Sequence, residues 1–199
     1  MTKLLLYYNT LKHLKLKQIY YRFKLILKTK LINLLNINIE KKYLKSINKN
    51  IDRINNINNE LFNDIDKNII NYLDTDLLSN EFQRLNQSNF KFLNVKHQFD
   101  SIEDINWDLK SNGQLWKFNL NYFDFSIDLG MFYRIEKRFD IYNTFKRIVN
   151  SWIDNTSFNY NDQCHPYVNS LRVVNWIYSY YLFKEQIVID KKFNNKFKK

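Results

Sequence analysis

The chain has 199 residues, 45% of them hydrophobic and 17% aromatic, so it can bury a core, and extensive disorder is excluded. Only two Gly, one Pro and one Cys are present, which excludes a turn-rich β-sandwich and an internal disulfide framework. The formal net charge of +11 indicates a polyanionic partner such as nucleic acid, acidic polysaccharide or anionic lipid, but does not choose among them.

Residues 1–35 are predicted to form a first segment, a basic amphipathic helix. Its apolar stripe consists of Leu16, Ile19, Tyr20, Phe23, Ile26 and Leu27. The other surface carries Lys15, Lys17, Arg22, Lys24, Lys28 and Lys30. Such a helix can lie on an anionic membrane or on nucleic acid, or it can be a solvated outer helix docked on its own domain. The last arrangement is the most common of the three.

Neither a secretory signal peptide nor a membrane-spanning segment is expected. The apolar run at residues 4–8 is short, polar residues interrupt it, and no small-residue cleavage site follows. No stretch approaches the 18 or so uncharged apolar residues of a spanning helix. The absence of a signal predicts a cytoplasmic location.

Residues 36–88 are predicted to be a low-complexity connector rich in Asn and Ile. The spacing of Ile51, Ile54 and Ile57 allows a weakly amphipathic helix, although asparagine is a poor helix former. The connector joins two segments with clearer patterns.

Residues 89–199 are predicted to form a helical domain. A short strand is expected at 90–95, where apolar and polar residues alternate, and a turn at 111–113. The predicted helices are 121–138, 140–154 and 168–186, and the Lys- and Asn-rich tail is expected to fray. The fold class is therefore mainly all-α, with successive helical hairpins as in an α/α bundle, solenoid or toroid.

The last predicted helix combines two apolar stripes with one narrow polar line. The polar line comprises Asn169, Arg172, Asn175 with the neighbouring Trp176, and Ser179. A helix that is apolar on two sides is mostly buried, and a buried arginine needs either a partner or a wet cavity. Two interpretations stay open: the helix lines a cleft, or Arg172 pairs with a core carboxylate.

Three blocks of residues resemble the N-terminal region of heparinase II/III-like polysaccharide lyases, particularly alginate-lyase-like members associated with surface polysaccharides. The first block is Thr10–Lys15 with Gln18–Arg22. The second is Phe92–Asn94, Trp107 and Leu115–Phe123. The third is Trp152–Ile153, Pro166–Tyr167 and Ser170–Ile177. They occur in the family's order and cover about two thirds of the chain.

The resemblance implies an incomplete α/α toroid whose inner helices line a cleft for a uronate-containing polysaccharide. Lyases of this kind perform β-elimination, for which they need a group that neutralises a carboxylate and a Tyr or His acting as base and acid. Family members are often periplasmic. Asn121 stands where this branch often has His. The family's catalytic Asn-His motif and Tyr fall beyond residue 199, so we expect no catalysis by this chain alone and a possible second chain that completes the toroid and β-sandwich.

Eight residues are candidates for binding substrate: Asn119, Tyr122, His165, Tyr167, Asn169, Arg172, Asn175 and Trp176. Arg172 could bind a substrate carboxylate, and Tyr167 could stack on a sugar. No metal or cofactor is expected, because Cys164 and the three scattered histidines form no ligand spacing. The alternative function is a basic helical nucleic-acid-binding protein, although no groove-reading motif is present. A third is peripheral membrane attachment through residues 16–34.

Overall fold

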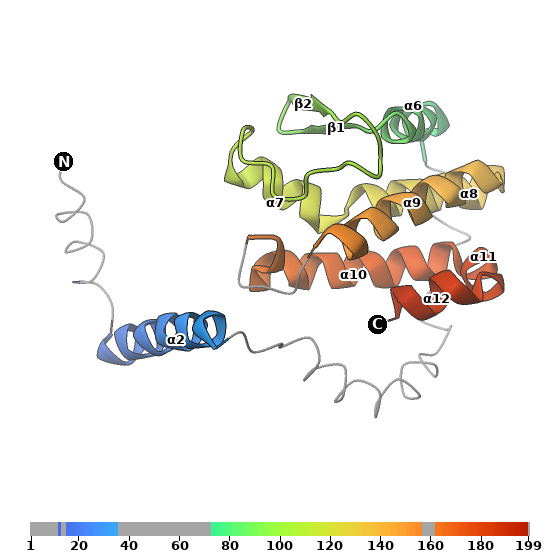
Figure 1. Ribbon diagram of the computed structural model, residues 1–199. Helices are drawn as coiled ribbons and strands as arrows, with labels where there is room; N and C mark the ends of the chain where they lie inside the picture. Colours follow the sequence, from blue (N-terminus) through green and yellow to red (C-terminus); the bar gives the residue numbers. More distant parts are fainter. Residues whose placement is uncertain (1–11, 13–14, 36–72, 157–161, 199) are drawn as a thin grey trace. The chain divides into compact units, whose positions relative to one another are not determined.

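A computed structural model describes residues 12, 15–35, 73–156 and 162–198 (Figure 1). The chain divides into two units, Met1–Tyr43 and Leu44–Lys199. The described part of the first unit is essentially one helix, α2 (Leu16–Leu34). The low-complexity sequence of residues 36–72, for which a weak helix is predicted, lies outside the described residues.

The second unit is mainly α-helical with one small sheet, which confirms the predicted fold class. Its elements are α6 (Thr75–Asn86), β1 (Asn89–Phe92), β2 (Val95–Gln98), α7 (Gln114–Tyr122), α8 (Phe125–Glu136), α9 (Phe139–Asn155), the 3-10 helix η3 (Asp162–Cys164), α10 (Pro166–Leu182), α11 (Lys184–Ile189) and α12 (Lys191–Phe197). None of the described helices combines the length and the apolarity needed to cross a bilayer.

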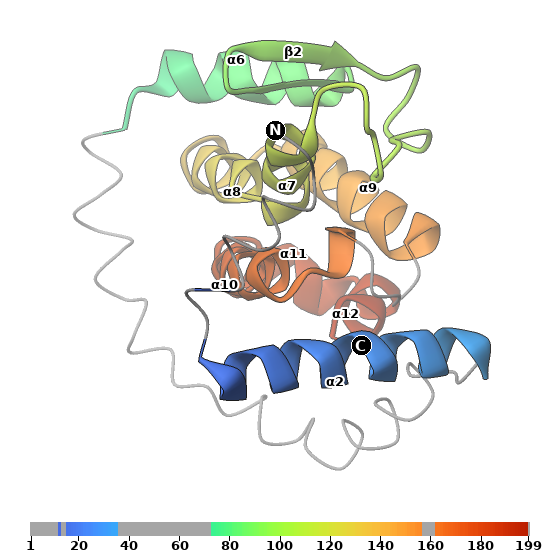
Figure 2. The ribbon, with the colours of Figure 1, turned by 90° about the vertical axis from the view of Figure 1, so that its left-hand side faces the viewer.

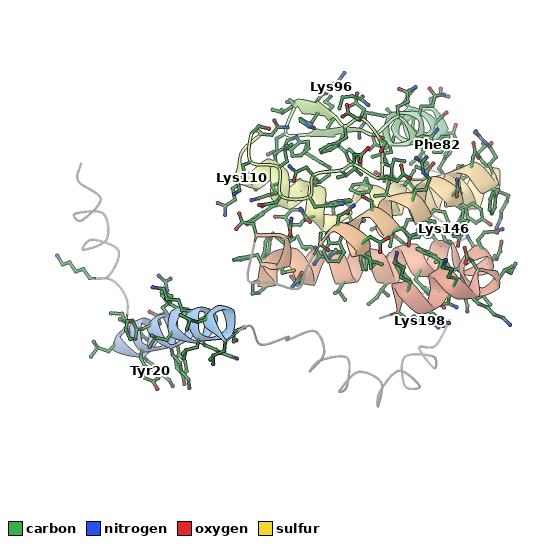
Figure 3. The ribbon with its side chains drawn as sticks, viewed as in Figure 1. Tyr20, Phe82, Lys96, Lys110, Lys146 and Lys198 are labelled. Carbon is green, nitrogen blue, oxygen red and sulfur yellow. The ribbon has the colours of Figure 1, made fainter. Side chains whose placement is uncertain are left out.

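The second unit is built in three layers, with α8 in the middle. The sheet and α6 form one outer layer, α7, α8 and α9 the middle one, and α10 to α12 the other outer one (Figures 1 and 2). α8 packs against α6, α9 and α10. The ring of Phe82 from α6 (Figure 3) lies 5.8 Å from that of Phe132 on α8, so the two layers meet in the aromatic core.

Asp74 is the N-cap of helix α6. Its carboxylate accepts hydrogen bonds from the backbone N–H groups of Asp76 and Leu77. It buries Leu78, Phe82 and Leu85 in the same core as the later helices. Residues 75–86, which the prediction assigns to the connector, therefore share a core with the later helices. We call the described residues from 73 to 198 the compact unit.

The strand predicted at 90–95 is in fact a hairpin. β1 and β2 pair antiparallel, with Asn89 opposite Gln98 and Phe92 opposite Val95. The two residues between the strands, Leu93 and Asn94, have φ values of 53° and 62°, as a type I′ turn requires. The prediction placed this turn inside a single strand.

The continuous helix predicted at 121–138 is also wrong. α7 ends at Tyr122, Phe123 adopts a left-handed conformation with φ 65°, and α8 starts at Phe125. Phe123 is nevertheless fully buried, with its ring stacked 5.3 Å from that of Trp107. Packing of this aromatic residue fixes the break in the core.

The C-terminal segment is helical where a frayed tail was predicted. The helix predicted at 168–186 ends at Leu182, and α11 and α12 follow it. Asp190 caps α12 by accepting from the backbone N–H of Phe193, whose side chain is 2% exposed and lies 6.0 Å from the Phe145 ring. The apolar residues spaced along the tail therefore add to the core.

Candidate functional site

The polar line of α10 faces the protein interior, whereas several of its apolar residues face outward. Arg172, Asn175 and Ser179 are 4%, 8% and 0% exposed. The opposite side of the helix exposes Val173, Val174, Ile177 and Tyr178. The predicted cleft-lining stripe is thus part of the core in this unit.

Arg172 is held by backbone carbonyls, not by a carboxylate. Its guanidinium donates to the carbonyl oxygens of Asn121 at 3.2 Å and Gln163 at 3.0 Å, and to the side chain of Asn169. It also lies 4.0 Å from the centroid of the Trp152 ring, a cation–π geometry. Burial lowers the pKa of Arg172 to about 10, so the group stays charged at neutral pH. Among the described residues no carboxylate pairs with Arg172, so the predicted pairing with a core carboxylate is wrong.

Asn175 and Ser179 continue the line of buried polar side chains that begins with Arg172. We call this line, together with Asn121 and Ser126, the buried seam. The Asn175 amide donates to the carbonyl oxygen of Tyr122 at 2.9 Å and to the Asp124 carboxylate. The Ser179 hydroxyl lies 2.7 Å from that of Ser126, which itself donates to the carbonyl of Phe123. Three consecutive carbonyls, freed where α7 breaks, are thereby satisfied by side chains.

Asn121 was not among the candidates, yet it is the hub of the seam. It is fully buried, and its amide donates to the carbonyls of Trp107 and Lys117, both at 3.0 Å. Its side-chain oxygen accepts from the indole N–H of Trp152 at 2.9 Å. Two features of the sequence single it out: its place next to an aromatic pair, and the resemblance described above, in which this position often carries His.

Asn169 and Trp176 support the seam from its two ends. The Asn169 amide donates to the Cys164 carbonyl at 3.0 Å, which ties α10 to η3. Trp176 packs perpendicular to Trp152, with ring centroids 5.4 Å apart. Its buried indole N–H has no hydrogen-bond partner among the described residues. Both residues therefore act as structural supports in this geometry.

The other four candidates lie where α7 meets the start of α10: His165 and Tyr167 are exposed, Asn119 is half-buried and Tyr122 is buried. We call Phe118, Tyr122, His165 and Tyr167 the aromatic surface. The imidazole of His165 stacks on Phe118 at 5.6 Å, and Tyr167 meets Tyr122 edge-on at 5.9 Å. Tyr167 is 57% exposed. Asn119 lies on this side of α7 too, but its side-chain amide donates a hydrogen bond to the backbone carbonyl of Leu115 at 2.8 Å.

Local bonding fixes the aromatic surface in place. His165 is the N-cap of α10, where its Nδ1 accepts from the backbone N–H of Tyr167 at 3.3 Å, and Pro166 follows at the first helical position. Tyr122 is 7% exposed, and burial together with the nearby Tyr167 and Asp124 raises its pKa. Tyr122 therefore holds its proton more firmly than a free tyrosine.

A buried lysine anchors the segments below this surface. The Lys117 amino group lies 2.8 Å from Asp108 and 2.7 Å from Asp162, which holds η3 against α7. Burial alone would lower the pKa of Lys117, but hydrogen bonds and charge interactions with both aspartates raise it overall. The same hydrogen bond lowers the pKa of Asp162. The amino group of Lys117 is already paired with two carboxylates, so this lysine is not free to bind an anion.

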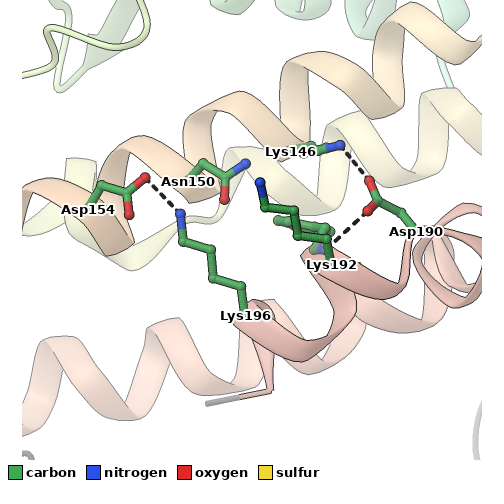
Figure 4. A pocket seen from close by; sticks show the side chains of 7 residues that line it. Lys146, Asn150, Asp154, Asp190, Lys192 and Lys196 are labelled. Atoms are coloured by element: carbon green, nitrogen blue, oxygen red, sulfur yellow. Dashed lines mark hydrogen bonds and ion pairs between the residues drawn. The ribbon is translucent and has the colours of Figure 1, made fainter.

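A second candidate site is a groove between α9 and α12, with a volume of about 310 Å³ (Figure 4). It is lined by Lys146, Asn150, Asp154, Asp190, Lys192, Phe193 and Lys196. Lys196 pairs with Asp154 at 2.7 Å, and Lys146 pairs with Asp190. Three amino groups thus line the groove against two carboxylates, which leaves a surplus of one positive charge. Sequence reasoning missed it because its α12 residues fell in the expected frayed tail.

Within the described residues, no group of three or more His, Cys, Asp and Glu side chains is arranged to hold a metal ion. Comparison of the chain with protein-family models, with curated proteins and with solved structures found no match. The function is therefore inferred from the side chains of the aromatic surface and the groove.

Proposed function

We propose that the compact unit binds an acidic, uronate-containing polysaccharide, as the N-terminal helical part of a heparinase II/III-like protein. The aromatic surface is the observation that carries this proposal. Exposed rings fixed by their neighbours suit the apolar faces of pyranose rings, because they lose little conformational freedom on binding. Tyr167 meets this description, since Tyr122 holds one edge of its exposed ring.

The charge distribution favours a sugar ligand over a nucleic acid for this unit. Residues 73–198 contain 16 basic and 15 acidic side chains, so the unit lacks the large positive surplus that phosphate backbones require. The groove with Lys192 offers a local positive charge for a carboxylate. Helices α8, α9 and α10 would then belong to the α/α toroid that the resemblance implies.

We propose a binding role without catalysis for this chain alone. A tyrosine that starts β-elimination as a base must lose its proton readily, whereas the pKa of Tyr122 is raised, first by burial. His165 already uses Nδ1 to cap α10. Neither residue is prepared for proton abstraction in this geometry.

The test is Tyr167→Ala in the full chain, with binding to polyuronate oligosaccharides measured by calorimetry. Loss of the exposed ring should weaken binding about three- to tenfold, as expected for one aromatic contact. Tyr178→Ala is the matched control, because Tyr178 is also exposed on α10 but lies about three turns further along the helix, away from Tyr122 and His165. It should bind like the unchanged protein.

Two results would contradict the proposal. One is equal polyuronate affinity in the Tyr167→Ala and Tyr178→Ala proteins. The other is a clear preference for duplex DNA that survives in both variants. Release of an unsaturated uronate product by the purified chain would overturn the non-catalytic assignment.

A further inference from the structure

The positive charge of the chain is concentrated at its N-terminal end. Residues 1–35 contain eight basic side chains and no acidic ones. They account for eight of the eleven net positive charges, although they make up less than a fifth of the chain. Since residues 73–198 are nearly balanced, most of the positive surplus of the chain lies at this end.

Helix α2 also exposes an unbroken apolar stripe. The stripe consists of Leu16, Tyr20, Phe23, Leu27, Leu31 and Leu34, at steps of three and four residues. Each of these side chains is at least 45% exposed. A stripe of this size in water carries a large hydrophobic cost, so it calls for an apolar phase to cover it.

Basic residues border the stripe. Lys17, Lys24 and Lys28 each directly follow a stripe residue, which places them about 100° further round the helix. Arg22 lies on the opposite border, next to Phe23. Lys30 falls at the edge of the stripe. The methylene groups of a lysine at such an edge can cover apolar surface while its amino group stays in polar surroundings.

From these two features we infer that α2 lies in the plane of an anionic lipid bilayer surface. The stripe enters the boundary between headgroups and acyl chains, and the bordering amino groups contact lipid phosphates and carboxylates. A nucleic acid would satisfy the charges but would leave Phe23 and Leu27 in water. No described helix can cross a membrane, so the helix lies on the surface.

The test is co-sedimentation of the full chain with lipid vesicles. We expect binding to phosphatidylcholine vesicles containing phosphatidylserine, little binding to phosphatidylcholine alone, and release at high salt. Phe23→Glu should weaken binding to the anionic vesicles at least tenfold. Gln18→Glu is the matched control: it makes the same change in charge on the opposite side of the helix, keeps the acceptor for the Lys15 N–H, and should cost far less.

Removing positive charges from α2 tests whether the bordering lysines contribute to binding. Lys24→Gln with Lys28→Gln should weaken anionic-vesicle binding roughly tenfold or more. Equal binding to neutral vesicles, or equal losses in Phe23→Glu and Gln18→Glu, would overturn the inference. So would absence of vesicle binding combined with self-association through α2, or with duplex DNA binding that Phe23→Glu leaves intact.

Discussion

At the residue scale, Arg172 shows how a charged side chain can hold several segments of a core together. Its guanidinium reaches carbonyls at the end of α7 and in η3, and its flat face covers Trp152 on α9. A guanidinium can do this because it has five N–H donors on a planar group. The residue therefore connects three elements that are distant in sequence.

We expect Arg172→Ala to destabilise the compact unit by about 3 kcal/mol, because it leaves buried carbonyls without donors and opens a space beside Trp152. Arg172→Lys should also destabilise it, since one amino group cannot serve the same partners. Urea unfolding followed by circular dichroism measures this. The exposed Arg138→Ala should leave the stability nearly unchanged. Unchanged stability in Arg172→Ala with lost saccharide binding would restore Arg172 as a ligand contact.

At the scale of elements, the contact between α8 and α10 depends on Gly130. A Cβ atom at this position would lie 2.6 Å from Leu182 Cδ1 and 2.8 Å from Leu182 Cβ. Such distances cannot be tolerated without movement of one helix. The absence of a side chain at Gly130 therefore sets how closely the middle layer approaches the outer one.

Gly130→Ala should destabilise the unit by about 1–3 kcal/mol, although alanine favours helix by roughly 1 kcal/mol. Thermal unfolding would reveal the loss as a lower midpoint. Glu136→Ala, at an exposed position of the same helix, should leave the midpoint nearly unchanged. A rise in the midpoint for Gly130→Ala would mean that the helices have room to separate.

The elements also show where sequence reasoning succeeds and where it stops. Helix α9 was predicted within one residue, because Ile141, Phe145 and Ile148 are spaced for a buried helical face. The orientation of α10 could not be predicted, because its polar residues bond to carbonyls that exist only where α7 breaks. The break at Phe123 that the prediction lacked is therefore also the reason why the side of α10 that faces the core was predicted wrongly. The outer candidates His165 and Tyr167 needed no such knowledge, since both lie at a helix start signalled by Pro166.

At the scale of the whole molecule, ion pairs join segments of the compact unit that are far apart in sequence, and three of them involve carboxyl groups with a lowered pKa. Lys117 pairs with Asp162, Lys146 with Asp190, and Arg147 with Glu103 at 2.8 Å. The hydrogen bond from each basic partner lowers the pKa of the respective carboxyl group. Charge within the unit is therefore used for internal connection, in contrast to residues 1–35, whose sequence contains basic but no acidic side chains.

These shifts predict acid sensitivity. A carboxyl group with a lowered folded-state pKa contributes stability above its unfolded value, near pH 4, and loses it as the pH falls through the folded value. The carboxyl group of Asp128 acts in the opposite direction between pH 7 and 5, because burial raises its pKa to about 6. The urea midpoint should therefore rise slightly from about pH 7 to 5 and fall below about pH 4. Lys146→Met should make the fall shallower, because Asp190 loses the partner that lowers its pKa. A midpoint that does not change down to about pH 3 would contradict this assignment.

The four tryptophans of the chain, at positions 107, 116, 152 and 176, all belong to the compact unit, whereas the rings of α2 are tyrosine and phenylalanine. Three of the four indoles have hydrogen-bond partners inside this unit. Intrinsic indole fluorescence therefore reports only on the helical core. A red shift would record its unfolding, while an event confined to α2 would leave the emission spectrum unchanged, so one optical signal can tell the behaviour of the two units apart.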